Sequence, residues 1–107
     1  MKEVNLEKGY PKVTEALILV KNEVEIAPKG EIIVFIHGYG SSGVGGKIRL
    51  ETRSWLKAQE KNGVISKVVI GEEFDMFDSK SRDIKNKDEE TKKYYGKINQ
   101  GITIIEK

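Results

Sequence analysis

The only histidine of this sequence, His37, stands where an apolar run passes into a glycine-rich segment. The residues that follow it are Gly38, Tyr39, Gly40, Ser41 and Ser42, and glycine recurs as far as Gly46. Glycine lets the backbone approach a ligand closely, and the free N–H groups at the start of a helix favour an anion. Because a helix is predicted directly after this segment, phosphate is the ligand that the turn favours. The alternative is a surface turn that needs glycine only for its backbone angles.

Two side chains near this turn are candidates for acid–base chemistry. Imidazole exchanges protons near neutral pH, so His37 is a candidate general acid or base for phosphodiester hydrolysis, or a donor to phosphate. Its alternative role is structural, holding the turn through hydrogen bonds to the backbone. Glu7 follows the first predicted strand, where it could orient His37 or a metal ion. An exposed glutamate at a strand end is the simpler interpretation.

A basic strip is predicted on the helix after the turn. Arg49, Arg53 and Lys57 are spaced four residues apart. Successive residues of a helix are about 100° apart, so these side chains line up beside the apolar stripe. The strip begins at the glycine turn, which lets both contact one phosphate backbone, although a solvated face is the alternative. The predicted nucleic-acid or phosphate-binding set is Gly38, Tyr39, Gly40, Ser41, Ser42, Lys47, Arg49 and Arg53.

Alternating strands and helices must position these residues. Periodicity predicts strands at Val4–Glu7, Ile32–Ile36, Val64–Ile70 and Ile102–Ile105, a helix with an apolar stripe from Val13 to Val24, and a helix at about Lys47–Lys61. The run Ile32–Ile36 is apolar without interruption, which is typical of a strand buried on both faces. Alternation implies parallel pairing with helical crossovers, so we predict an α/β two-layer sandwich with four strands and both helices on one face.

The stretch from Asp75 to Lys97 does not fit this pattern, because charged residues dominate it. Such a composition buries little apolar surface and offsets little chain entropy. We therefore predict one domain over residues 1–107 with an exposed, mobile insertion at about 75–97, helical in part between Ser79 and Lys93. Phe74, Met76 and Phe77 are expected to anchor its start against the sandwich.

Composition narrows the function classes. The chain has 107 residues, 37% of them hydrophobic, 34% charged, with a net charge of +2, so any basic surface must be local. The absence of cysteine excludes disulfides and thiolate metal sites, and one histidine leaves zinc dependent on carboxylates. No cofactor is identified, and a divalent metal stays open. Met1–Asn5 lacks an apolar leader and no apolar run reaches the length of a membrane span, so we expect a cytoplasmic protein.

Three common motifs overlap the glycine turn and none is complete. Gly38-x-Gly40-x-x-Gly43 matches the dinucleotide fingerprint, but the second half of that fold is missing. A Walker A loop would need glycine at Ser41 and a hydroxyl at Ile48. The run into His37 is similar to the oxyanion strand of α/β-hydrolases, yet there is no G-x-S-x-G elbow and no second histidine.

Taken in order, the segments resemble the Smr (small MutS-related) family. The His-Gly-x-Gly signature is His37-Gly38-Tyr39-Gly40. The run from Gly46-Lys47-Ile48-Arg49 to Trp55-Leu56 is similar to the family's Gly-x-Leu-Arg…Trp-Leu. Val13-Thr14-Glu15-Ala16-Leu17 and the closing Gly101-Ile102-Thr103-Ile104-Ile105 are similar to its first helix and last strand. The likeness covers nearly the whole chain except Asp75–Lys97.

This resemblance implies a β-α-β-α-β-β fold with a mixed four-stranded sheet, like the C-terminal domain of bacterial translation initiation factor three. It also implies binding to DNA or RNA and, as in several members, endonuclease activity. The family's Leu-Asp-x-His motif on the first strand is missing, since Val4–Gly9 contains no histidine, which marks a divergent branch. The alternative is a non-catalytic interaction module, such as a ribosome- or repair-associated adaptor. A small phosphorylated ligand at the glycine turn is a further alternative.

Overall fold

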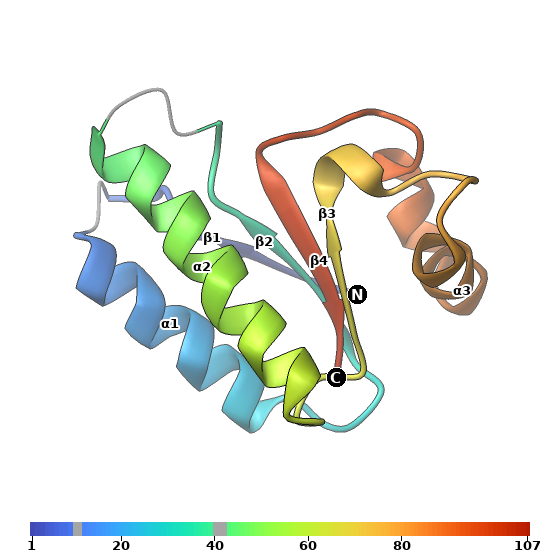
Figure 1. Cartoon of the computed structure of the whole chain (residues 1–107), viewed down its shortest axis with the longest axis horizontal. Helices are drawn as coiled ribbons and strands as arrows, with labels where there is room; N and C mark the ends of the chain where they lie inside the picture. The colour runs from blue at the N-terminus through green and yellow to red at the C-terminus, as the bar shows by residue number, and fades with distance from the viewer. Residues whose placement is uncertain (10–11, 40–42) are drawn as a thin grey trace.

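The sheet is mixed, and its last strand in sequence lies in the interior. The computed structural model describes residues 1–9, 12–39 and 43–107. In this part of the chain, four strands pair in the order β1-β2-β4-β3. They are β1 (Lys2–Asn5), β2 (Ile32–Ile36), β3 (Lys67–Ile70) and β4 (Ile102–Glu106). β1 runs parallel to β2, whereas β4 is antiparallel to both of its neighbours (Figure 1). The predicted mixed four-stranded sheet is confirmed.

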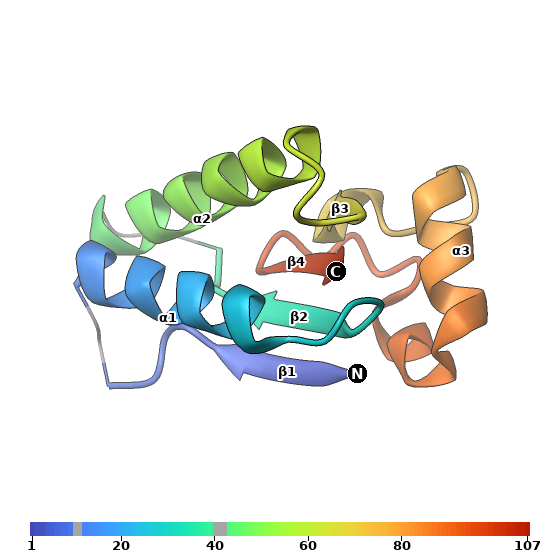
Figure 2. The ribbon, with the colours of Figure 1, turned by 90° about the horizontal axis from the view of Figure 1, so that it is seen from below.

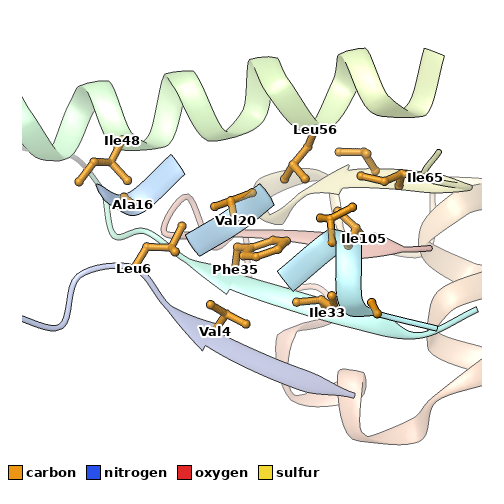
Figure 3. Close-up of a cluster of buried hydrophobic side chains, with 13 residues drawn as sticks. Val4, Leu6, Ala16, Val20, Ile33, Phe35, Ile48, Leu56, Ile65 and Ile105 are labelled. Atoms are coloured by element: carbon orange, nitrogen blue, oxygen red, sulfur yellow. The ribbon is translucent and has the colours of Figure 1, made fainter. Parts of the chain in front are cut away.

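Two long helices cover one face of this sheet. They are α1 (Val13–Ile26) and α2 (Gly43–Lys61), which lie side by side across the strands in Figures 1 and 2. Figure 3 shows the core between the layers, where Val20 and Leu56 of the helices meet Ile33, Phe35 and Ile105 of the strands. All five side chains are at most 1% exposed, and burial of each stabilises the fold by about 1.5–3 kcal/mol. This is the predicted two-layer α/β sandwich. Among the helices of the described residues, none is both long and apolar enough to cross a membrane.

The opposite face of the sheet is also covered, by the segment that sequence reasoning expected to be exposed. This segment contains α3 (Ser79–Lys87) and η2 (Glu89–Tyr94), and the 3-10 turn η1 (Gly71–Glu73) leads into it. Ile84 and Phe74 pack with Val34, Val69 and Ile104 in a second apolar cluster. Alternation along β2 sends Ile32 and Val34 to this side, so they need a cover that α1 and α2 do not provide.

The prediction of an exposed insertion at 75–97 is therefore wrong at its buried positions. Ile84, Ser81 and Thr91 are 0% exposed. Asp78 caps α3 by accepting hydrogen bonds from Ser81, at 2.8 Å from the backbone N and 2.6 Å from Oγ. The expected partial helix is confirmed by α3. Of the expected anchors, Phe74 is buried, but Met76 and Phe77 are 62% and 86% exposed.

Two element boundaries in the structure differ from the predicted ones. β3 begins at Lys67 rather than Val64 because the end of α2 uses the intervening residues. Gly63 has φ +81°, Val64 N donates to Gln59 O at 3.0 Å, and Gly63 N donates to Glu60 O at 3.1 Å, which is a Schellman motif. At the other end, α2 begins at Gly43, four residues before the predicted start at Lys47.

The docking of α3 has a direct stability test. Ile84→Ala removes the fully buried side chain that joins α3 to the sheet, so we expect a loss of about 2–5 kcal/mol in the free energy of unfolding. Ile26→Ala is the matched control, because Ile26 is 70% exposed and its truncation should change stability by less than about 0.5 kcal/mol. Denaturant unfolding measures both. Equal values for the two variants, together with rapid amide exchange across α3, would restore the mobile insertion.

Candidate functional site

One edge of the sheet gathers the polar residues predicted to carry function. Parallel pairing of β1 with β2 places Asn5 opposite Ile36, and antiparallel pairing places Ile36 opposite Ile102. The ends of β1, β2 and β3 and the start of β4 therefore share this edge, which we call the carboxyl edge. In Figure 1 the ends of β2 and β3 and the start of β4 lie at the top. In open α/β sheets, ligands bind outside the carboxyl ends of the strands.

His37 is buried at the carboxyl edge, with both ring nitrogens bonded. Its side chain is 2% exposed. Nδ1 lies 2.9 Å from the Gly38 carbonyl oxygen, and Nε2 lies 2.8 Å from Thr103 Oγ1. A carbonyl oxygen only accepts, so Nδ1 donates, and in the neutral ring Nε2 then accepts the Thr103 hydroxyl proton. This tautomer satisfies both nitrogens without a positive charge.

Arg53 extends this arrangement across the edge. Its Nε donates to Thr103 Oγ1 at 2.9 Å, and its Nη1 and Nη2 donate to the two carboxylate oxygens of Glu72 at 3.1 and 2.7 Å. Nη2 also donates to the carbonyl oxygens of Ile102, at 3.0 Å, and Gln100, at 3.3 Å. Arg53 was predicted to bind phosphate, but its guanidinium is already bound by a bidentate carboxylate. We call the chain Gly38–His37–Thr103–Arg53–Glu72 the polar brace.

Electrostatics keep the brace in one protonation state. Burial lowers the pKa of His37 to about 4, because it penalises the charged ring more than the Gly38 hydrogen bond favours it. The positive charges of Arg53 and Arg49 lower this pKa further, while Glu72 opposes them. For Glu72, burial raises the pKa, but hydrogen bonds from Arg53 and from backbone outweigh it, and the net pKa is lowered. At neutral pH the brace holds a neutral imidazole and an ion pair.

Arg49 differs from Arg53, although both stand on α2 one turn apart. Its charge acts on the pKa of both His37 and Glu72, which places it at the same edge. Its Nε is shielded from solvent and has no hydrogen-bond partner among the described residues. The hydroxyl of Thr52, which is 0% exposed, has none either. A donor without an acceptor is costly, so the Arg49 guanidinium keeps hydrogen-bonding capacity that an anion could use, whereas Thr52 lies inside the fold.

Glu7 reaches the glycine turn, as expected, but it does not hold the imidazole. An Asx turn directs it, in which Asn5 Oδ1 accepts from Glu7 N at 2.8 Å and from Lys8 N at 3.2 Å. Its carboxylate lies against Gly38, whose φ is +76° and where a Cβ atom would come within 2.3 Å of Oε2. Both nitrogens of His37 have other partners, so Glu7 does not orient the ring. The glutamate is exposed beside the turn.

A second glycine contact fixes the turn from the other side. The backbone N–H groups of His37 and Gly38 both donate to the Gly101 carbonyl oxygen at 3.0 Å. A Cβ atom on Gly101 would lie 3.4 Å from the Cα of Gly38, so the two backbones are in contact. The segment before β4 is thereby tied to the end of β2.

The other predicted site residues have different outcomes. Tyr39 is 65% exposed at the turn, and Lys47 is exposed on α2. Gly40, Ser41 and Ser42 lie outside the described residues. Residues 1–9, 12–39 and 43–107 contain no group of three His, Cys, Asp or Glu side chains placed to hold a metal ion. Trp55 is partly buried and packs against the apolar cluster.

Sequence reasoning missed Thr103 and Glu72, which complete the brace. Thr103 is the one polar residue within the apolar run Ile102–Ile105, and its 0% exposure means that its hydroxyl must be bonded. That interruption was a usable signal. Glu72 had none, because its role depends on how η1 turns back toward α2.

The brace predicts how the only histidine titrates. The folded pKa, about 4, lies below the value of about 6.5 in an unfolded chain, so the unfolded state binds a proton first as the pH falls. The stability contributed by neutral His37 is complete above about pH 6.5 and is lost as the pH falls from there to about 4. The contribution is on the order of 3 kcal/mol. Because the chain has one histidine, its imidazole NMR signals give the midpoint directly. A midpoint near 6.5 in the folded protein would contradict the buried neutral ring.

No family model, no curated protein and no solved structure matches the chain.

Proposed function

We propose that this chain is an Smr-type nucleic-acid-binding domain that contacts the phosphate backbone at its carboxyl edge, with Arg49 as the principal contact. The observation that supports the proposal most is the contrast between the two arginines of α2. Arg53 is bound by Glu72 and by backbone carbonyls. Arg49 stands at the same edge, and its Nε has no partner among the described residues.

The surroundings of Arg49 are suited to phosphate. A guanidinium binds phosphate oxygens through paired, charge-assisted hydrogen bonds. The exposed Lys47 adds a positive charge on the same helix. The resemblance of His37-Gly38-Tyr39-Gly40 to the Smr signature supports nucleic acid over a small phosphorylated ligand. We expect the protein to bind DNA or RNA in the cytoplasm.

The geometry supports binding more than hydrolysis. A general base must reach the proton that it removes, whereas His37 is 2% exposed and its Nε2 already accepts from Thr103. Its lowered pKa, about 4, also makes it a weak base at neutral pH. We therefore assign His37 to holding the turn in place. Endonuclease activity remains a hypothesis, for which the exposed Glu7 is the remaining acid–base candidate near the turn.

The alternative is an Smr-fold interaction module, such as a ribosome- or repair-associated adaptor. The missing first-strand histidine supports it, because a divergent branch can keep the fold without the chemistry. Loss of a phosphate contact would change the affinity of such a module for its partner only a little. The following experiment therefore separates the two functions.

Arg49→Ala should weaken nucleic-acid binding. Loss of a charge-assisted hydrogen bond is worth about 1.5–3 kcal/mol, which corresponds to roughly tenfold to a hundredfold in Kd. The dependence of log Kd on log salt should fall by about 0.7–0.9 for the phosphate contact removed. Electrophoretic shifts with DNA and with RNA at several salt concentrations measure both quantities.

Lys29→Ala is the matched control for this experiment. Lys29 is exposed just before β2 begins, at the opposite edge of the sheet, and its replacement removes the same charge. We expect its affinity to stay within about twofold of the parent protein. Equal affinities and salt slopes for Arg49→Ala and the parent protein would reject Arg49 as a phosphate contact.

Strand cleavage is tested separately with nicked-product assays on DNA and RNA, with and without Mg²⁺ or Mn²⁺. We expect binding without cleavage, because His37 is held neutral within the brace. Removing a true general acid or base lowers the rate by about 10²–10⁴-fold. Cleavage that falls by this factor in a folded His37→Ala variant would restore His37 as a catalytic residue and reject its purely structural role.

A further inference from the structure

We infer that the apolar groove between the loop that joins η1 to α3 and the segment that joins η2 to β4 binds an unstacked base of a single-stranded nucleic acid. The inference rests on the proposed function and adds to it the form of nucleic acid that this chain selects. The groove has a volume of about 360 Å³ and is lined by Asp75, Met76, Phe77, Tyr95, Gly96 and Ile98. Neither the phosphate contact at Arg49 nor the polar brace includes any of these residues.

Three large apolar side chains of the groove are exposed together. Phe77 is 86% exposed, Ile98 is 70% exposed and Met76 is 62% exposed. A single exposed apolar residue is ordinary, but three around one concave site indicate a binding surface. Phe77 was predicted to anchor the segment, and its exposure leaves a full aromatic face without a partner from the described core.

The groove is built on a fixed base. Phe77 N donates to Asp75 Oδ1 at 2.8 Å, and Arg82 Nη1 donates to the Met76 carbonyl oxygen at 2.7 Å. Tyr95 packs edge-on against the buried Phe74, with ring centroids 5.3 Å apart. These contacts fix the backbone of the loop between η1 and α3.

Ile98, which lines the groove, has an unfavourable backbone angle. Its φ is +51°, a left-handed conformation that β-branched residues rarely adopt. Glycine or asparagine would fit this angle better, so a large apolar side chain here lowers stability rather than raising it. Such local conflicts are typical of positions that serve binding.

Charge around the groove favours a nucleic acid over an apolar peptide. Lys85 Nζ lies 4.9 Å from the centre of the Tyr95 ring, and Arg82 and Lys97 are exposed beside the groove. Asp75 and Asp78 accept hydrogen bonds from Phe77 N and Ser81 N and keep their negative charge, so the contacts with phosphates fall to Arg82, Lys85 and Lys97. Aromatic rings that stack bases, flanked by cations that contact phosphates, are the usual elements of single-strand binding sites.

The groove is also continuous with the carboxyl edge. Two residues after Ile98, the Gln100 carbonyl oxygen accepts from Arg53 at 3.3 Å, and Gly101 packs against Gly38. In Figure 1 the segment that leads into β4 crosses the top of the molecule from the side of α3 to the start of β4. In this proposal, one strand contacts Arg49 with its phosphates and the groove with a base. A duplex keeps its bases stacked and paired, so it cannot do both.

The test compares single-stranded and duplex oligonucleotides of one sequence that carry 2-aminopurine, whose fluorescence responds to stacking. Phe77→Ala should weaken single-strand binding about tenfold or more and abolish the fluorescence response, while duplex binding changes less than about twofold. Ile98→Gly should weaken single-strand binding in the same direction without lowering the thermal stability. Ile26→Ala, a truncation of another exposed apolar residue on α1, should change neither.

The outcomes separate this inference from the proposed function. If Arg49→Ala weakens binding and Phe77→Ala does not, the groove assignment is overturned and the phosphate contact stands. If Phe77→Ala alone weakens binding, the groove stands and Arg49 loses its role. Equal loss of single-strand and duplex binding in Phe77→Ala also overturns the selection for a single strand. Self-association of the chain that Phe77→Ala abolishes, without any fluorescence response to the oligonucleotide, assigns the groove to a second copy instead.

Discussion

The structure depends on a constraint imposed by its two central strands, which are buried on both faces. In β2 and β4 successive apolar side chains point to opposite sides of the sheet, so a single layer of helices cannot shield them. The helices α1 and α2 cover one side. The other side is covered by a charged segment that contributes only a few apolar residues, chiefly Ile84 and Phe74. The position of every polar group at the carboxyl edge follows from this arrangement, because the segment returns the chain to that edge before β4.

Most of the fold could be predicted from sequence, because its elements carry strong periodic signals. The run Ile32–Ile36 was located to the residue, and the apolar stripe from Val13 to Val24 gave α1. The docking of α3 was not predicted. Ser79–Lys87 has one apolar residue, Ile84, and the composition of the segment as a whole gives no sign that this residue is buried. Yet the sequence contained the clue that a strand apolar on both faces, with both helices on one side, leaves a face to be covered.

The candidate site was predictable in its location but not in its internal bonding. The glycine turn, His37 and the arginines of α2 were expected to meet, and they do. What spacing alone could not indicate is that neighbouring arginines have different roles, since Arg53 is bonded to Glu72 from a segment of irregular backbone. The buried imidazole was likewise open to two interpretations until both nitrogen partners were known. The carboxyl edge therefore combines an interior of neutral and paired groups with an outer surface where Lys47 is exposed.

The strand order also has a consequence for how the chain folds as it is synthesised. β4 is the last strand to leave the ribosome, yet it lies between β2 and β3 and supplies hydrogen bonds to both. Until it emerges, β3 has no neighbour in the sheet, and one edge of β2 stays unpaired. Only the β1–β2 pair with α1 and α2 can form earlier. Completion of the sheet then requires residues 102–106 to pair with β2 and β3 at once, a contact of large sequence separation that is slow to form. Until β4 emerges, one edge of β2 and both edges of β3 are open to pairing with other strands.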